Sequence, residues 1–394
     1  MAALIDLDTA IDRTTEGVLT IDRTETVSLA AASERVLAAD VVADRDLPPF
    51  NRAAMDGYAY DHDHAATSRP VCGHIQAGDP MQVDVSPGHC VGIATGAPVP
   101  PSCNTVVPHE LTDRSDPLTI TADAPPRGGN IHPQAADAAN GQILINAGQL
   151  LSSAEVGIAA MAGCESLLVR AKPQVTLLTS GDEVVGTGIE PAAHQIRNSN
   201  HPMISMLAER AGGELNQHHH LADDPNALTA VLEHAADSAD VIVTTGGISA
   251  GKHDFLPDAF EKLGCHWRIA GVAIKPGKPI RVGRLQDCVV VCLPGNPVSS
   301  LVAGAIFLAP IIRALVGLTP GPRWRSVRLT ETVRSNPHRT LLRPAHTPTS
   351  STVSIPTWQG SGDLAHLAGT RGIVRLPLGK QVDAGTEVPF TRWP

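Results

Sequence analysis

Residues 173–318 alternate between continuous apolar runs and helical patterns. The run VIVTT at 241–245 is β-branched, which is typical of a strand buried on both faces of a parallel sheet. VTLLTS, a stretch ending near Leu221, residues around Val272 and Val282, and CVVVCL predict further strands. Helices are predicted at 202–211, from Pro225, near 256–263 and at 298–316. This alternation predicts a doubly wound α/β domain.

The rest of the chain has shorter apolar segments. Residues 6–19 predict a helix, 25–30 and 36–42 short strands, and 153–162 a helix that begins after Ser152 or Ser153. Gly- and Pro-punctuated β segments fill 58–145 and the end of the chain. We therefore expect an α/β multidomain protein with four parts: an N-terminal scaffold domain (1–46 plus 146–172), a β-rich insert domain (47–145), the α/β domain (173–318) and a C-terminal β domain (319–394).

Composition and charge narrow the class of protein. At 394 residues the chain exceeds what one core serves, and its formal charge of -10 argues against a nucleic-acid binder. The N-terminus has no apolar signal core, and no uninterrupted run of about 18 apolar residues occurs, so we expect a cytoplasmic protein without a membrane segment. The seven cysteines include no CxxC, which favours buried free thiols over disulfides or zinc.

Polar loops follow four predicted strands of the α/β domain. They are TSGDE at 179–183, DDP at 223–225, GGISAGKHDF at 246–255 and LPGNPVSS at 293–300. Ligands of open α/β sheets lie beyond the carboxyl ends of the strands, and glycines let backbone N–H groups approach an anion. Asn296 and Ser299 flank Pro297 at a helix start, which fits either an anion site or a plain N-cap.

Two further polar stretches have a functional and a structural interpretation. AIKPGKPI holds Lys275 and Lys278 close together between prolines, and two adjacent cations favour a bound anion over a solvated turn. The histidines His218–His220 lie in a predicted strand, where alternation puts only two side chains on one face. For these histidines we therefore favour a solvated edge over a metal site.

Nine motifs along the chain resemble those of one known family. They are AMDGYA (54–59), TGAPVP (95–100), SGDE (180–183), RNSN (197–200), DDP (223–225), GGISAG (246–251), KPGKP (275–279), LPGNPVS (293–299) and QGSG (359–362). In order and spacing they resemble the molybdopterin molybdenumtransferases, the bacterial relatives of the gephyrin E domain. The resemblance covers almost the whole chain.

The resemblance implies a fold, a reaction and an assembly. The α/β domain is expected to be Mog-like, and the subunits to form an elongated homodimer with each site between the α/β domain of one subunit and the β insert of the other. Adenylylated molybdopterin and molybdate are the implied substrates, Mg²⁺ the cofactor, and AMP and molybdenum cofactor the products. A molybdopterin adenylyltransferase and acceptor molybdoenzymes are implied partners.

The resemblance also implies the site residues. The catalytic residues are expected to be Asp56, Asp137, Glu183 and Asp254, and the metal ligands Glu183, Asp223 and Asp254. The substrate-binding residues are expected to be Thr95, Gly246, Gly247, Ser249, Gly251, Lys275, Lys278, Pro294, Gly295, Asn296, Ser299 and Ser361. Carboxylates suit Mg²⁺, and cations with a metal ion neutralise a phosphoanhydride and an oxyanion.

The sequence departs from the family pattern in two places. HPQAAD at 132–137 replaces an arginine-rich stretch ending in Gly-Glu-Asp, and Lys252 stands where the family has an acid.

Two other functions are alternatives to the transferase. One is a non-catalytic molybdopterin-binding or scaffold protein, which a measurement of turnover by the purified protein would distinguish from the transferase. A nucleotide pyrophosphatase is the other, and the AMDGYA-bearing insert and the C-terminal domain count against it.

Overall fold

The computed structural model describes residues 4–80, 83–221, 225–248 and 256–394. The chain divides into two compact units, which we call unit 1 (Met1–Glu25, Glu34–Val36 and Val169–Pro394) and unit 2 (Thr26–Ser33 and Leu37–Leu168). The division falls within strands β1 (Thr24–Ser28) and β10 (Ser166–Arg170). The finer division into four domains stays a prediction.

Unit 1 is built on a six-stranded sheet. Its strands, in spatial order, are β14 (Glu214–Leu221), β11 (Gln174–Ser180), β15 (Val241–Thr245), β19 (Cys288–Leu293), β18 (Arg281–Leu285) and β16 (His266–Ala270). The first four run parallel, and β18 and β16 are antiparallel to their neighbours. The predicted α/β class is confirmed, with an antiparallel edge added.

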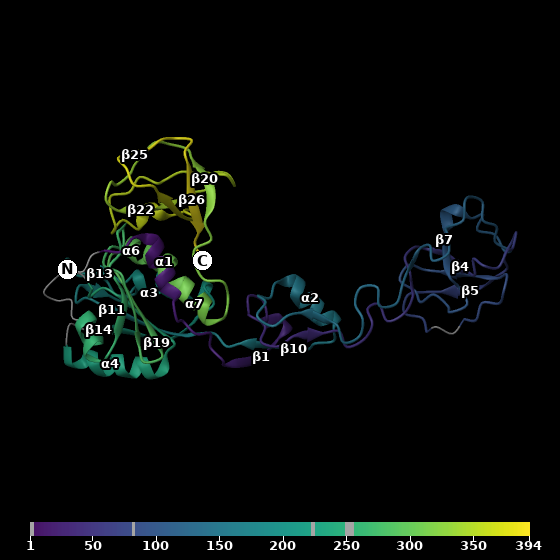
Figure 1. Ribbon diagram of the computed structural model, residues 1–394, viewed down its shortest axis with the longest axis horizontal. Helices are drawn as coiled ribbons and strands as arrows, with labels where there is room; N and C mark the ends of the chain where they lie inside the picture. Colours follow the sequence, from purple (N-terminus) through teal and green to yellow (C-terminus); the bar gives the residue numbers. More distant parts are fainter. Residues whose placement is uncertain (1–3, 81–82, 222–224, 249–255) are drawn as a thin grey trace. The chain divides into compact units, whose positions relative to one another are not determined.

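Alternate residues of the central strands serve two cores, one on each face. Val241 and Val243 pack into one cluster, while Ile242 packs into the other, and all three are fully buried. The first face is covered by α1 (Leu7–Thr15), α3 (Asn200–Arg210), α6 (Pro297–Ala303) and α7 (Ala309–Leu315), and the second by α4 (Pro225–Ser238) and α5 (Leu256–Lys262) (Figure 1). Burial on both faces explains why these strands are continuously apolar.

The long apolar helix predicted at 298–316 is confirmed as a continuous helical segment, Pro297–Leu315, with one irregular turn. Five residues, η3 (Gly304–Leu308), form a π-helical turn between α6 and α7. Pro310 follows at the start of α7, and since proline has no N–H it cannot continue the α-helical hydrogen bonding, which fits a local change of helix type there. Pro297–Leu315 is long and apolar enough to cross a membrane, but 83% of an apolar 18-residue stretch within it is buried, as expected of a core helix.

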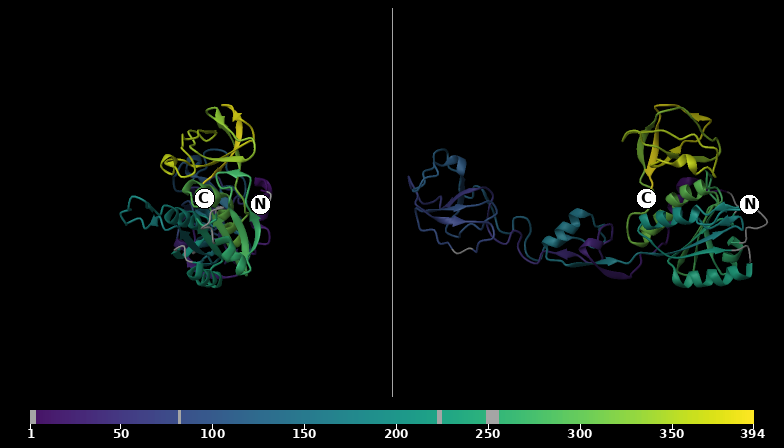
Figure 2. Two further views of the ribbon diagram at one scale, coloured as in Figure 1. Left: turned by 90° about the vertical axis from the view of Figure 1, so that its left-hand side faces the viewer. Right: turned by 180° about the vertical axis from the view of Figure 1, so that it is seen from behind.

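A second six-stranded sheet occupies the end of unit 1. Its order is β17 (Ile274–Lys275), β22 (Thr340–Ala345), β24 (Gly372–Leu376), β26 (Glu387–Arg392), β20 (Arg325–Leu329) and β23 (Thr352–Val353). The C-terminal strands form a layer of their own, visible from both sides (Figures 1 and 2). The expected strand around Val272 is wrong, because Val272 lies between β16 and β17, which belong to different sheets, and makes only an isolated bridge with Ile5.

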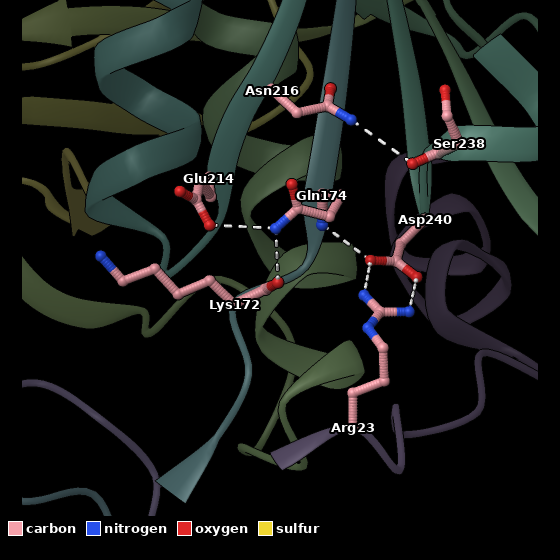
Figure 3. A network of polar contacts seen from close by, with 7 residues as sticks. All are labelled: Arg23, Lys172, Gln174, Glu214, Asn216, Ser238 and Asp240. Carbon is pink, nitrogen blue, oxygen red and sulfur yellow. Dashed lines mark hydrogen bonds and ion pairs between the residues drawn. The ribbon is translucent and has the colours of Figure 1, made fainter. Parts of the chain in front are cut away.

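The remaining elements of unit 1 are short. They are β12 (Val184–Val185) paired with β13 (Ile196–Arg197), β21 (Val333–Arg334) paired with β25 (Gln381–Val382), and the 3₁₀ turn η4 (Ala365–Leu367). Arg23, Gln174 and Asp240 form a polar network at the start of β11 (Figure 3). Through this network the ion pair of Arg23 with Asp240 fastens the segment before β1 to the sheet.

Unit 2 is built mainly from short strands, as the sequence predicts. A four-stranded sheet has the order β5 (Val71–Ile75), β6 (Cys90–Ile93), β4 (Gly57–Tyr60) and β7 (Thr105–Pro108), and the paired strands are β3 (Arg52–Ala53) with β8 (Ile131–His132) and β2 (Val41–Val42) with β9 (Ile143–Ile145). The helical elements are η1 (Leu29–Ala31), η2 (His109–Leu111) and α2 (Ser153–Met161). Ser152 caps α2 in a capping box with Glu155, which confirms the predicted helix start.

All seven cysteines are free thiols. Five of them are buried, namely Cys90, Cys103, Cys265, Cys288 and Cys292, and burial raises the pKa of each to about 12. Such thiols stay protonated and unreactive at neutral pH. Cys72 is exposed and Cys164 partly buried, so the prediction of buried free thiols is confirmed for five of the seven.

Candidate functional site

Three described loops meet where the parallel strands β11, β15 and β19 end. The N–H of Gly246 donates to the carbonyl of Leu293 at 3.2 Å, and a Cβ on Gly246 would lie only 2.9 Å from Ser180 Oγ. A Cβ on Gly295 would lie 3.4 Å from Gly246 Cα. Gly246 also has a φ of +92°, so both its backbone conformation and its surroundings require glycine. The loops predicted from strand ends therefore do lie together.

Asn200, at the first position of α3, joins this loop cluster. Its Nδ2 donates to the carbonyl of Gly295 at 2.7 Å. Its Oδ1 is buried and has no hydrogen-bond partner among the described atoms. The motif RNSN drew attention to this segment, but Asn200 was not among the predicted site residues. A buried amide oxygen beside the loops is an acceptor for a ligand donor group.

Asn296 occupies the N-cap position of α6 without capping it. Instead its Nδ2 donates to Ser361 Oγ at 3.0 Å, and the N–H of Val298 donates to the carbonyl of Ser361, also at 3.0 Å. The Ser300 hydroxyl donates to the carbonyl of Pro294, and Ser299 is buried. The predicted residues of the 293–300 loop and Ser361 are thus brought together.

Lys275 and Lys278 are exposed and have no ion pair with any described residue. Lys275 ends β17, in register with Leu341 of β22. Two residues further along β22 is Arg343, whose Cζ lies 4.6 Å from the ring centre of Trp358. Burial lowers the pKa of Arg343 to about 10, and no described acid pairs with it. The prediction missed Arg343, because an arginine within a strand-like run carries no sequence signal of its own.

Of the three predicted metal ligands, Glu183 lies in the described part of the chain. Glu183 is exposed, and its carboxylate oxygens lie 2.7 and 2.8 Å from where a Cβ on Gly181 would be, so the side chain folds back over its own loop. Its oxygens are the kind of ligand that Mg²⁺ takes. The described residues contain no group of three or more His, Cys, Asp or Glu placed to hold a metal ion. The predicted site residues Asp223, Ser249, Gly251 and Asp254 lie outside the described part of the chain, as does Lys252, which departs from the family pattern.

Asp56 and Thr95 form a second group of predicted residues, in unit 2. Asp56 Oδ1 accepts hydrogen bonds from the N–H of Thr95 at 2.7 Å and from its hydroxyl at 2.8 Å. These bonds, the backbone one first, lower the pKa of Asp56. Next to Asp56, a Cβ on Gly57 would lie 1.9 Å from the carbonyl oxygen of Val107, so the close approach of β7 requires glycine. Asp56 is held as a carboxylate and not merely as a turn residue.

Two histidines accompany the predicted carboxylates of unit 2. His132 Nε2 lies 2.9 Å from Asp137 Oδ1, so the altered 132–137 stretch supplies its own partner for the surviving aspartate. His109 packs edge-on against Tyr58, with 5.0 Å between ring centres, and its Nδ1 is buried without a partner among the described atoms. His109 also contributes to the lowered pKa of Asp56. Neither histidine was predicted.

The triple histidine lies in β14, at the edge of the sheet as expected, but the prediction of a solvated group is wrong for His218. The ring of His201, from α3, stacks on His218 at 3.6 Å between centres. Thr179 Oγ1 lies 3.1 Å from His218 Nε2 and 3.0 Å from His220 Nδ1, and it accepts from Asn198 Nδ2 at 3.1 Å. Burial, followed by repulsion from the other histidines, lowers the pKa of His218 to about 4.

These features define a multidomain α/β protein with cationic and amide-bearing loops beyond the carboxyl ends of its parallel strands, an arrangement suited to an anionic ligand. The family model described as "MoeA N-terminal region (domain I and II)" matches residues 5–163, and "Probable molybdopterin binding domain" matches 176–314. The chain belongs to the molybdopterin molybdenumtransferases.

Individual relatives cover nearly the whole chain. Molybdopterin molybdenumtransferase 2 of Mycobacterium tuberculosis is 34% identical over 379 residues, covering 92% of this chain and 93% of the relative. The molybdopterin molybdenumtransferase of Synechocystis is 30% identical, covering 93% and 95%. The solved structure of the molybdopterin biosynthesis moea protein from Pyrococcus horikosii matches with a TM-score of 0.84 and 26% identity over 100% of both chains. The predicted family and enzyme class are confirmed, and the non-catalytic alternative gains no support.

Proposed function

We propose that this protein transfers molybdenum from molybdate to adenylylated molybdopterin, with release of AMP and molybdenum cofactor. In this reaction water cleaves the phosphoanhydride bond to AMP, and the two dithiolene sulfurs replace two oxo groups of molybdate, which take up protons and leave as water. The proposal rests on the family membership of the chain and on one observation, which is that three cationic side chains on the segment after β16 and in β22 have no ion pair with any described residue. They are Lys275, Lys278 and Arg343.

The cations suit both anionic substrates. Lys275 and Arg343 lie on paired strands, and Arg343 is held by Trp358, which stands three residues before Ser361. A cation without an acid partner gains most from a bound oxyanion, since nothing else neutralises it. Asn296 and Ser361, which are hydrogen-bonded to each other, offer further amide and hydroxyl groups at the 293–300 loop. This part of the site is accordingly proposed to hold molybdate and the phosphates of the pterin.

We also propose Mg²⁺ as the cofactor. Its ligands would be Glu183, Asp223 and Asp254, of which only Glu183 is described. Bound there, Mg²⁺ would neutralise charge on the phosphoanhydride oxygens. The residues of the chain would orient the substrates around it.

The resemblance supports three further proposals about assembly and location. The protein would act as a homodimer in which Asp56 of one subunit completes the site that contains Asp254 of the other. It would receive its substrate from a molybdopterin adenylyltransferase and deliver its product to molybdoenzymes. A cytoplasmic location stays a prediction from the sequence.

Release of AMP by the purified protein tests the function. With adenylylated molybdopterin and Mg²⁺, AMP should appear when molybdate is added, and no more than slowly without it. Tight binding of the pterin with no AMP release under any molybdate concentration would instead identify a binding protein. AMP release at a rate that does not depend on the molybdate concentration would identify a pyrophosphatase.

A further inference from the structure

An open cavity of about 540 Å³ lies at the surface of unit 2, on the side of β4 that carries Tyr60. Its volume is in the range of small-molecule sites. The lining is mixed polar and apolar, with one permanently charged side chain, and consists of Tyr60, His62, His64, Ala65, Ala66, Thr67, Arg69, Ile120, Ala122 and Ala124. In the described part of unit 2, no carboxylate lines this cavity.

Arg69 is the unusual residue of this cavity, because it is a buried cation without an anion. It is only 5% exposed, and no described acid forms an ion pair with it. Its Nη2 donates to the carbonyl of His64 at 2.7 Å, but Nε and Nη1 are buried without any described partner. Burying an uncompensated guanidinium is costly, so its retention calls for an acceptor.

Tyr60 has the same property. It is 2% exposed, and its hydroxyl is buried with no described partner. Arg69 Cζ lies 4.5 Å from the centre of the Tyr60 ring, so the two unsatisfied groups lie close together. Burial raises the pKa of Tyr60, which keeps the hydroxyl protonated and able to donate a hydrogen bond.

The backbone holds Arg69 in place. Its N–H donates to the carbonyl of Leu118 at 2.8 Å, and its carbonyl accepts from the N–H of Leu118 at 2.7 Å. Tyr60 belongs to β4, between β6 and β7 in the sheet. The backbone of both residues is thus held by hydrogen bonds, as expected for a preorganised binding site and not for a loose surface loop.

We propose that this cavity binds a small organic anion, with its phosphate or carboxylate group at Arg69 and Tyr60 and an apolar body against the alanines and Ile120. The guanidinium fork matches such groups in two-point contacts. The site is separate from the residues assigned to the transferase reaction, and it does not depend on the proposed function.

Phenyl phosphate, benzoate and neutral benzyl alcohol test this proposal on the full-length protein by titration calorimetry. One or both anions should bind one to one, at least tenfold more tightly than the alcohol, and the stronger anion distinguishes a phosphate site from a carboxylate site. Arg69→Met keeps the apolar stem and should weaken binding at least tenfold, about 1.4 kcal/mol. Arg127→Met is the matched control, because Arg127 is exposed and paired with Asp63 in the same unit.

A second variant and an NMR measurement test the proposal even if Arg69→Met does not fold. Tyr60→Phe keeps the ring under Arg69 and should weaken anion binding about threefold through loss of one donor. Methyl NMR of alanine-labelled full-length protein should show anion-induced shifts at Ala65, Ala66, Ala122 and Ala124. No binding of either anion at about 10 mM, equal binding by Arg69→Met, or shifts confined to other alanines would overturn the proposal.

Discussion

Thr95 donates both its backbone N–H and its hydroxyl to the same oxygen of Asp56, at 2.7 and 2.8 Å. The second carboxylate oxygen of Asp56 takes no part in these bonds. Thr95 therefore orients the carboxylate and stabilises its charged form, leaving one oxygen free for a substrate or for bound water. This relationship joins two motifs, AMDGYA and TGAPVP, through residues that are 39 positions apart in the chain.

Thr95→Val should move the acid limb of the pH–rate profile to higher pH. The hydrogen bonds from Thr95 lower the pKa of Asp56, and the variant loses the hydroxyl bond while keeping the backbone one. A carboxylate with a less depressed pKa becomes protonated at higher pH, so activity falls off earlier on acidification. AMP release measured from about pH 3 to 8 checks this, and the variant should be slower than wild type only at the acid end. An unshifted profile would mean that the charge of Asp56 is not required.

Lys275→Ala and Lys278→Ala should each raise the molybdate concentration for half-maximal rate by roughly tenfold, about 1.4 kcal/mol. Each variant removes a cation that has no ion pair among the described residues, so little folding energy is lost with it. Lys262→Ala, at the exposed end of α5, is the matched control. If all three variants show the wild-type molybdate dependence, the lysine loop has only a structural role.

Mixed dimers should recover activity from two inactive variants. If Asp56 and Asp254 contribute to the same site from different subunits, an Asp56→Ala/Asp254→Ala mixed dimer retains one intact site of its two. Subunits are mixed after mild dissociation, and native mass spectrometry counts the mixed species. Up to about half the wild-type rate per mixed dimer is expected. Mixed dimers that form and stay inactive would place both residues in one subunit's site.

The strand-end loops could be predicted from the sequence because their cause is local. A β-branched run such as Val241–Thr245 followed at once by two glycines indicates a buried strand and a tight turn, and strand ends of a parallel sheet share an edge. Gly246 then lies against Ser180 because the two strands are neighbours.

The missed residues depend on contacts that the local sequence does not encode. Arg343 becomes important because β17 joins the sheet of β22, and Asn200 because α3 begins beside the 293–300 loop. The sequence predicts that His218 is solvated, but the ring of His201 in α3 stacks on it. In each case the partner is far away in the chain, so neither periodicity nor spacing could reveal it.

His218 should make unit 1 acid-labile between pH 6.5 and about 4. Its pKa is about 4 in the folded protein against 6.5 for the free side chain, so within this range the unfolded state binds more protons. Stability therefore rises with pH through this window and is lost on acidification. His218→Gln should make the dependence of unfolding free energy on pH shallower. His234→Gln, an exposed position in α4, should leave it unchanged.

Urea unfolding followed by tryptophan fluorescence gives the required free energies for unit 1 alone. All four tryptophans, Trp267, Trp324, Trp358 and Trp393, belong to that unit. Equal pH slopes for wild type and His218→Gln would show that His218 titrates normally in the folded state.

Asp240→Ala should destabilise unit 1 more than Arg23→Ala does, although the two residues form one ion pair. Arg23 donates to Asp240 at 3.1 and 2.5 Å, and its side chain is 54% exposed, so its loss should cost about 0.5–1 kcal/mol. Asp240 is 15% exposed and also accepts from the N–H of Gln174 at 2.7 Å (Figure 3). Its removal leaves that N–H and the guanidinium unpaired, at a cost of about 2–3 kcal/mol.

A double-mutant cycle in urea, read by the tryptophans of unit 1, separates the two contributions. The Arg23→Ala/Asp240→Ala variant should be at most about 0.3 kcal/mol less stable than Asp240→Ala, because in Asp240→Ala the side chain of Arg23 has already lost its partner. Arg328→Ala is the control, since Arg328 and Glu387 form an exposed pair at 3.5 Å. Its loss should cost less than about 0.5 kcal/mol. Equal costs for Arg23→Ala and Asp240→Ala would show that the bond from Gln174 contributes nothing, so that the network stabilises the sheet only through its ion pair.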